Sequence, residues 1–179
     1  MRLRRIVSRL ESDDFELFGL PRRFRLDRGD IDARRRSLQA EVHPDRFATA
    51  HASARRVAMQ WAARVNEAYA RLKNPLLRAA YLCELHGVPI DAEDNTAMPA
   101  DFLMQQMEWR ESLDDAEGRD AVEALLATLE AHRAVAYGRL AVLLDDARDF
   151  AAAAHEVRAL MFVERFATDV EDRLAAKEA

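Results

Sequence analysis

Three consecutive residues in the first half of the chain, His43–Pro44–Asp45, combine an imidazole, a constrained backbone and a carboxylate. Proline fixes φ at about −65° and disfavours helix in the residue before it, so the tripeptide predicts a loop between two helices. An ionised Asp45 only accepts hydrogen bonds, which suits an arginine or amide of a partner. His43 as a general base is the alternative, but the local sequence offers no nucleophile and no second histidine at helical spacing. The pattern favours a recognition loop over a catalytic site.

A predicted helix in the second half, about Pro99–Asp115, carries two apolar faces at about 100° per residue. The first face, expected to be core, comprises Phe102, Trp109 and Leu113. The second comprises Leu103, Met104 and Met107, with Glu108 and Glu111 beside it. A helix packed on one side does not need two apolar faces, and methionine adapts well to a partner surface. Burial of both faces within a bundle stays open, whereas a metal site at the two glutamates lacks an accompanying carboxylate–histidine motif.

A further predicted helix, about Asp149–Ala176, also carries apolar residues on two faces. Val157, Leu160 and Ala167 share one face. Phe162 and Phe166 lie at about 140° and 180° from Val157, so they are expected to point away from that face.

These residues belong to a chain whose composition favours an all-α protein. Half of the 179 residues are apolar and 33% are charged, which is typical of a globular protein. Alanine and leucine are abundant, while five glycines and five prolines are too few for a loop-rich β architecture. No apolar run is long enough for a transmembrane helix, and the single cysteine, Cys83, excludes a disulfide framework.

The order of predicted elements gives two helical domains. Asp13 is expected to cap a short helix that ends before Pro21, and Asp30 to cap a second helix running to about Val42. The remaining predicted helices are about Ala52–Lys73, Leu76–His86, Pro99–Asp115, Arg119–Asp145 and Asp149–Ala176. The polar, turn-rich segment 88–97 is the expected linker. Residues 1–80 carry 18 basic and 10 acidic side chains and residues 81–179 carry 9 and 22, which suggests different partners for the two domains.

The surroundings of the tripeptide resemble the J-domain of DnaJ-type co-chaperones over about residues 13–82. The matching residues are Phe15, Phe18, Gly19 and Leu20 before it and VNEAYARLKNPLLRAAY (65–81) after it. The resemblance implies that His43, Pro44 and Asp45 engage the ATPase domain of a 70-kDa heat-shock chaperone. Arg36 matches a position that is usually basic in the family, and Arg34 and Arg46 would add electrostatic steering. Arg35 and Val42 depart from the family pattern, which carries larger or aromatic residues there.

Four further phrases, DDFELFGLP, HPDRFA, RAAYLCELHG and FLMQQMEWRESLDD, resemble the HscB family of J-type co-chaperones in iron–sulfur cluster assembly. The resemblance covers nearly all of residues 13–176. In that family the second helix face binds the scaffold protein IscU, which implies a scaffold-binding set here. This set is Leu103, Met104, Met107, Glu108, Glu111 and Phe162, and Phe166 is our extension of it.

The sequence and the resemblance together predict an adaptor without enzymatic activity, metal or cofactor. A J-domain (12–87) with a helical hairpin and short flanking helices follows an N-terminal arm (1–11). A linker (88–97) leads to a three-helix scaffold-binding bundle (98–179), in an L-shaped arrangement. The expected partners are an HscA-type chaperone and an IscU-type scaffold, with neither nucleic acid nor membrane. A bacterial cytoplasmic location is favoured over the mitochondrial matrix, because the N-terminal CxxC pair common in mitochondrial members is missing. The alternatives are a J-protein with a different client and a basic helical nucleic-acid binder.

Overall fold

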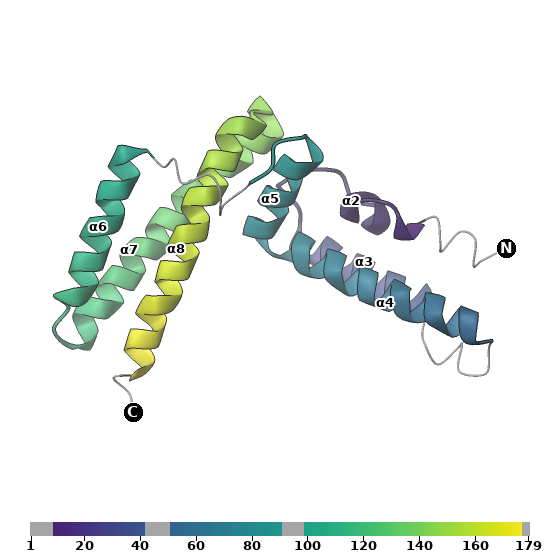
Figure 1. The fold of residues 1–179 in the computed structure, drawn as a ribbon, viewed down its shortest axis with the longest axis horizontal. Coiled ribbons are helices and arrows are strands. Elements are labelled where there is room, and N and C mark those ends of the chain that lie inside the picture. The colour runs from purple at the N-terminus through teal and green to yellow at the C-terminus, as the bar shows by residue number, and fades with distance from the viewer. Residues whose placement is uncertain (1–8, 42–50, 91–98, 177–179) are drawn as a thin grey trace. The chain divides into compact units, whose positions relative to one another are not determined.

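The computed structural model describes residues 9–41, 51–90 and 99–176, and the regular secondary structure in these ranges is helical (Figure 1). The chain divides into two compact units, Met1–Tyr81 and Leu82–Ala179. His43–Pro44–Asp45, Arg46 and most of the expected linker lie outside the described residues. Within the described ranges, no helix has the length and apolarity needed to cross a membrane. The predicted all-α class is confirmed, while the domain limits and the L-shaped arrangement stay predictions.

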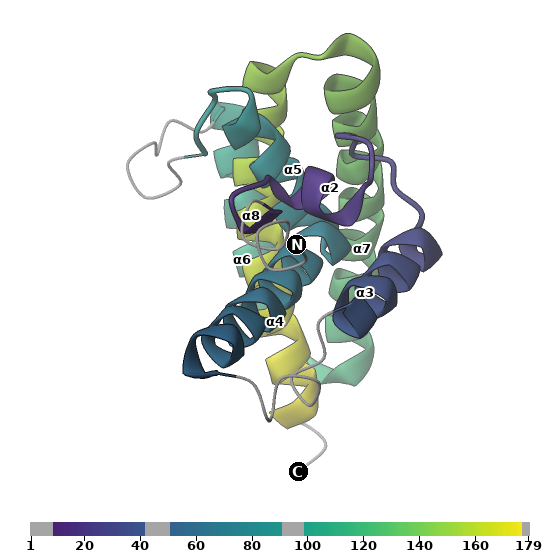
Figure 2. The ribbon, with the colours of Figure 1, turned by 90° about the vertical axis from the view of Figure 1, so that its right-hand side faces the viewer.

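The N-terminal unit is built on a helical hairpin. It contains α2 (Asp14–Phe18), α3 (Arg28–Glu41), α4 (Ala52–Lys73) and the first part of α5 (Pro75–Leu85). Helices α3 and α4 pack side by side, and α2 packs on both of them (Figure 2). The segment that contains His43–Pro44–Asp45 therefore connects the two helices of this hairpin, α3 and α4.

The ends of α2 follow from local chemistry, as predicted. The Asp13 carboxylate accepts a hydrogen bond from the Glu16 N–H at 3.0 Å, and Gly19 ends the helix in the left-handed region at φ 61°. The prediction that Asp30 caps the next helix is wrong. Helix α3 begins at Arg28, and Asp27 caps its first turn by accepting the Asp30 N–H at 3.1 Å. The two aspartates stand three positions apart, so one serves as the cap and the other lies inside the first turn.

A buried stripe along α4 forms the core of this unit. Trp61, Val65 and Leu72 are fully buried, and the Trp61 indole donates to the Leu38 carbonyl at 3.1 Å. Two further apolar residues of α4, Val57 and Tyr69, are half-buried.

The C-terminal unit contains the end of α5 and a three-helix bundle formed by residues 99–176. Helix α6 (Ala100–Asp114) packs on α7 (Gly118–Ala141), which packs along α8 (Phe150–Ala176). The predicted 119–145 helix is not regular to its end, because Val142–Ala147 forms a π-helical turn (η2). Arg148 then reverses the chain in the left-handed region at φ 55°. The core cluster of this unit comprises Trp109, Ala116, Val122, Leu125, Leu129, Val163, Phe166, Ala167 and Val170.

Candidate functional site

Helix α6 has one buried face and one exposed apolar face. Trp109 is 4% exposed in the core, and Phe102 and Leu113 pack against the same cluster. The opposite face presents Leu103 at 44%, Met104 at 64% and Met107 at 70% exposure. The expected division of this helix into a core face and an exposed apolar face is therefore confirmed, and burial of both faces in the bundle is excluded.

Two carboxylates border this exposed face. Glu108 and Glu111 are both exposed, and Glu108 accepts a hydrogen bond from the Gln105 side-chain amide at 2.9 Å. No group of three or more histidine, cysteine or acidic side chains suited to a metal ion occurs among the described residues. The glutamates are thus available to basic groups of a partner at the edge of the apolar surface.

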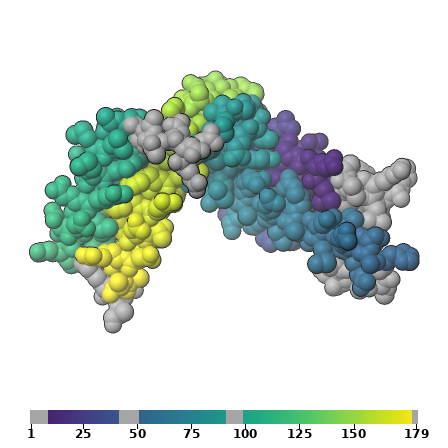
Figure 3. Space-filling model, in the orientation of Figure 1, coloured from purple at the N-terminus to yellow at the C-terminus, as the bar shows by residue number. Residues whose placement is uncertain are grey.

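Phe162 of α8 lies beside α6, and Figure 3 shows the two helices adjacent on one face of this unit. The Phe162 ring meets Phe102 edge-to-face at 6.0 Å and stacks on Phe166 at 6.0 Å between centroids. It is half-buried, whereas Phe166 is only 5% exposed. The expectation that Phe166 points away from the core is wrong. Because α8 is flanked by both α6 and α7, its buried arc is wider than one narrow face.

The bundle also contains a half-buried histidine that packs on the core face of α6. His132 of α7 is half-buried, and its ring lies 5.0 Å from Trp109 and 6.5 Å from Phe102 between centroids. Burial lowers the pKa of His132. The Glu156 carboxylate acts in the opposite direction and the Arg139 guanidinium in the same direction as burial, and the net shift is downward. A neutral imidazole therefore helps to hold the core face of α6 against α7. A lone histidine on a helix gave no sequence signal for this contact.

On the N-terminal unit, the predicted chaperone-binding residues that are described lie on α3. Arg34 and Arg36 are exposed. Arg35, between them, turns inward, with its guanidinium carbon 4.1 Å from the centroid of the Tyr69 ring on α4. This cation–π contact links α3 to α4.

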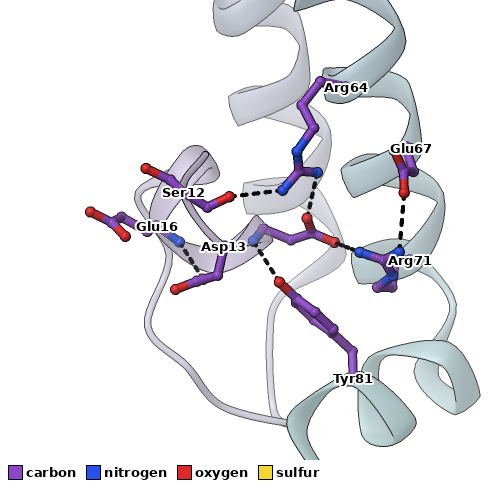
Figure 4. A network of polar contacts seen from close by, with 8 residues as sticks. Ser12, Asp13, Glu16, Arg64, Glu67, Arg71 and Tyr81 are labelled. Atoms are coloured by element: carbon purple, nitrogen blue, oxygen red, sulfur yellow. Dashed lines mark hydrogen bonds and ion pairs between the residues drawn. The ribbon is translucent and has the colours of Figure 1, made fainter. Parts of the chain in front are cut away.

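A buried charge network holds α2 against α4 and α5 (Figure 4). The Asp14 carboxylate is fully buried, and it pairs with Arg64 and with Arg71, the latter at 2.7 Å. The Asp14 N–H donates to the Tyr81 hydroxyl at 3.1 Å, and burial raises the pKa of Tyr81. Arg64 also donates to the Ser12 carbonyl at 2.8 Å. A buried carboxylate needs such partners, so this network fixes α2 on the hairpin.

A helical hairpin held by a short helix, followed by a separate three-helix bundle, is the architecture of a J-domain co-chaperone with a second helical domain. Consistent with this class, residues 98–171 match the family model described as the HSCB C-terminal oligomerisation domain. The chain belongs to the HscB family of co-chaperones. It is 53% identical over 164 residues to the co-chaperone protein HscB homologue of Burkholderia multivorans, with 90% of this chain and 93% of that protein covered.

Two solved structures support the same family. The chaperone HscB from Vibrio cholerae has a TM-score of 0.81 and 36% identity, with 94% of this chain and 100% of that chain covered. The human co-chaperone protein HscB has a TM-score of 0.83 and 28% identity, with 94% and 83% covered. The predicted family and the predicted J-domain and bundle are therefore confirmed.

Proposed function

We propose that this protein is a non-enzymatic co-chaperone of iron–sulfur cluster assembly in the bacterial cytoplasm. In this proposal the bundle binds an IscU-type scaffold, and the J-domain stimulates the ATPase of an HscA-type 70-kDa chaperone. Membership of the HscB family supports it. The observation that carries it is the exposed apolar face of α6, because several large apolar side chains that lie exposed together on one helix face form a patch of the kind that marks an interaction surface.

The scaffold would bind to Leu103, Met104, Met107 and the half-buried Phe162, with Glu108 and Glu111 at the edge. The three α6 side chains are 44%, 64% and 70% exposed, so a partner can remove most of their apolar area from water. The two carboxylates would select basic groups around the apolar centre. This arrangement matches interfaces in general, where apolar anchors provide affinity and edge charges provide orientation.

The chaperone would bind to His43, Pro44 and Asp45, with Arg34, Arg36 and Arg46 adding positive charge. Residues 1–80 carry 18 basic and 10 acidic side chains, so this half would attract an acidic surface. A chain that holds both partners raises their effective concentration near each other. The protein would thus act by bringing the scaffold to the chaperone while the J-domain triggers ATP hydrolysis.

A steady-state ATPase assay of an HscA-type chaperone tests this proposal. We expect stimulation by the protein alone and a larger stimulation when an IscU-type scaffold is present. Asp45→Asn should remove both effects, whereas Met104→Ala should remove only the scaffold-dependent part. Stimulation that never responds to the scaffold would favour a J-protein with a different client. Absence of any stimulation, together with salt-dependent DNA binding, would favour the nucleic-acid alternative.

A further inference from the structure

Arg9 contacts α2, α3 and α4 of the N-terminal unit. Its guanidinium pairs with the Glu41 carboxylate of α3 at 2.8 Å and donates to the Leu17 carbonyl of α2 at 3.1 Å. The guanidinium carbon also lies 5.0 Å from the centroid of the Trp61 ring on α4. Trp61 is fully buried, so Arg9 forms part of its cover. These contacts together hold the chain at residue 9 against the hairpin.

The two polar contacts of Arg9 have local reasons. Leu17 lies in the last turn of α2, where carbonyls lack a partner within the helix and an arginine can supply one. Glu41 is the last residue of α3, and the last turn of this helix contains no basic residue. A carboxylate is unfavourable at the negative end of the helix dipole, so a cation from elsewhere in the chain stabilises it. Arg9 therefore supplies what the ends of both helices lack.

The anchored position of Arg9 is at the end of α3 that leads to the tripeptide. Glu41, its partner, stands two positions before His43 in the sequence. Arg34 is seven positions before Glu41, which places the two residues about 20° apart around α3 and about 10 Å apart along it. Arg9 is thus held on the face of α3 that carries Arg34, one of the predicted chaperone-binding residues.

The residues that precede Arg9 are basic. Residues 1–9 contain four arginines and no acidic residue, so they supply half of the net positive charge of residues 1–80. Arg4 and Arg5 are five and four positions before Arg9, so their Cα atoms stay within about 17 Å of its own however the chain runs. An acidic surface bound at the tripeptide and at Arg34 would therefore be within reach of both side chains, and their charge would attract it.

We propose that residues 1–9 are a further contact element for the 70-kDa chaperone, an inference that rests on the proposed function. Arg4 and Arg5 are the contact residues, and they meet carboxylates on the acidic surface of the chaperone. Arg9 is a positioning residue, because its own guanidinium is engaged with Glu41 and Leu17. The segment adds to affinity and to the association rate, while the tripeptide keeps the role of triggering ATP hydrolysis.

Steady-state ATPase assays of an HscA-type chaperone, titrated with the full-length protein, test this inference. Arg4→Ala/Arg5→Ala should raise the concentration for half-maximal stimulation about threefold at low salt and leave the maximal rate unchanged. The difference should shrink as the salt concentration rises, because exposed charges are then screened. Arg165→Ala/Arg173→Ala is the matched control. It removes the same charge from exposed positions of α8 in the other unit and should behave as the parent.

Arg9→Ala tests the anchor separately. It should also raise the half-maximal concentration about threefold, and Arg9→Lys should lie closer to the parent because a lysine still pairs with Glu41. In the Arg9→Ala background, Arg4→Ala/Arg5→Ala should add less than about twofold, since unanchored arginines are no longer held beside the chaperone. Arg9→Ala also uncovers Trp61, so thermal melts set an assay temperature at which every variant is folded.

The outcomes separate this inference from the proposed function. Parent-like behaviour of Arg4→Ala/Arg5→Ala at low salt would refute the inference alone, provided that Asp45→Asn abolishes stimulation. An equal loss in the matched control would reduce the effect to overall charge, and additive losses with Arg9→Ala would overturn the anchoring role. Weaker binding of Arg4→Ala/Arg5→Ala to DNA or to anionic vesicles, with parent-like stimulation, would assign the segment to another partner. If the parent itself gives no stimulation, the proposed function fails and this inference fails with it.

Discussion

Alanine substitutions on the two faces of α6 should separate folding from binding. Trp109 is 4% exposed, and its ring contacts Phe102 at 6.4 Å and His132 at 5.0 Å between centroids. Truncation of a buried tryptophan costs about 3–5 kcal/mol, because apolar burial is lost and a cavity remains. In a chain of this size 1 kcal/mol lowers Tm by about 2–4 °C, so Trp109→Ala should melt about 6–20 °C below the parent.

Met107→Ala should show the reverse behaviour. Met107 is 70% exposed, so only a small part of the roughly 1.5–3 kcal/mol available from full burial of a methionine is present in the free protein. We expect a loss below about 1 kcal/mol in stability and a Tm within about 4 °C of the parent. If Met107 is an interface anchor, its truncation should cost about 1–3 kcal/mol in binding, a loss of roughly 5- to 150-fold in affinity.

The assay pairs a thermal melt with a scaffold titration for each variant. Met59→Ala is the matched control, because Met59 is 69% exposed on α4 in the other unit and should alter neither measurement. A melt of Met107→Ala as low as that of Trp109→Ala would show that the face carrying Met107 is core in solution. Unchanged scaffold affinity for Met107→Ala, with a parent-like melt, would instead show that the exposed face does not bind the scaffold.

Three further predictions concern the chaperone side and the core of the bundle. Asp45→Asn should abolish ATPase stimulation without changing circular dichroism or scaffold affinity, and full stimulation by this variant would contradict the assignment. Association with the chaperone should slow as salt rises, because exposed charges are screened beyond about 8 Å at physiological ionic strength, and Arg36→Glu should slow it further; a rate independent of salt would argue against steering. Because burial lowers the pKa of His132, the unfolded chain takes up the proton first, so the stability that the neutral imidazole contributes is lost as the pH falls below about 6.5. Chemical unfolding between pH 7.5 and about pH 5 should show a smaller decline for His132→Gln than for the parent, and equal declines would contradict this role.

Features set by near neighbours in the chain could be predicted from the sequence. The cap of α2 uses Asp13, Glu16 and Gly19, which lie within six positions of one another. The two faces of α6 follow from helical periodicity alone. Trp109 and Met107 lie on opposite sides of the helix, so a neighbouring helix that buries Trp109 leaves Met107 exposed. The prediction of Asp30 as the cap failed because Asp27 can also cap a helix, and the position of the first helical residue decides which of them does.

Features set by packing partners were beyond the sequence. Phe166 packs in the core cluster and His132 packs on Trp109. Both environments depend on which helix lies beside the residue. A helical wheel gives angles about one axis, but it does not say how many neighbouring helices share that axis. Two neighbours bury a wider arc of α8 than one, so the wheel placed Phe166 outside a core that includes it.

Phe162 and Phe166 lie where the proposed scaffold-binding surface borders the core of the bundle. The two rings stack at 6.0 Å, yet Phe166 is 5% exposed and belongs to the core cluster, whereas Phe162 is half-buried and packs against that cluster. The inner ring contributes to folding and the outer one keeps a face that a partner can reach. Their stacking would hold the outer ring in place before binding, so less conformational entropy would be lost in the proposed scaffold complex. A substitution at Phe166 should therefore weaken scaffold binding indirectly, through the position of Phe162, as well as lowering the stability of the bundle.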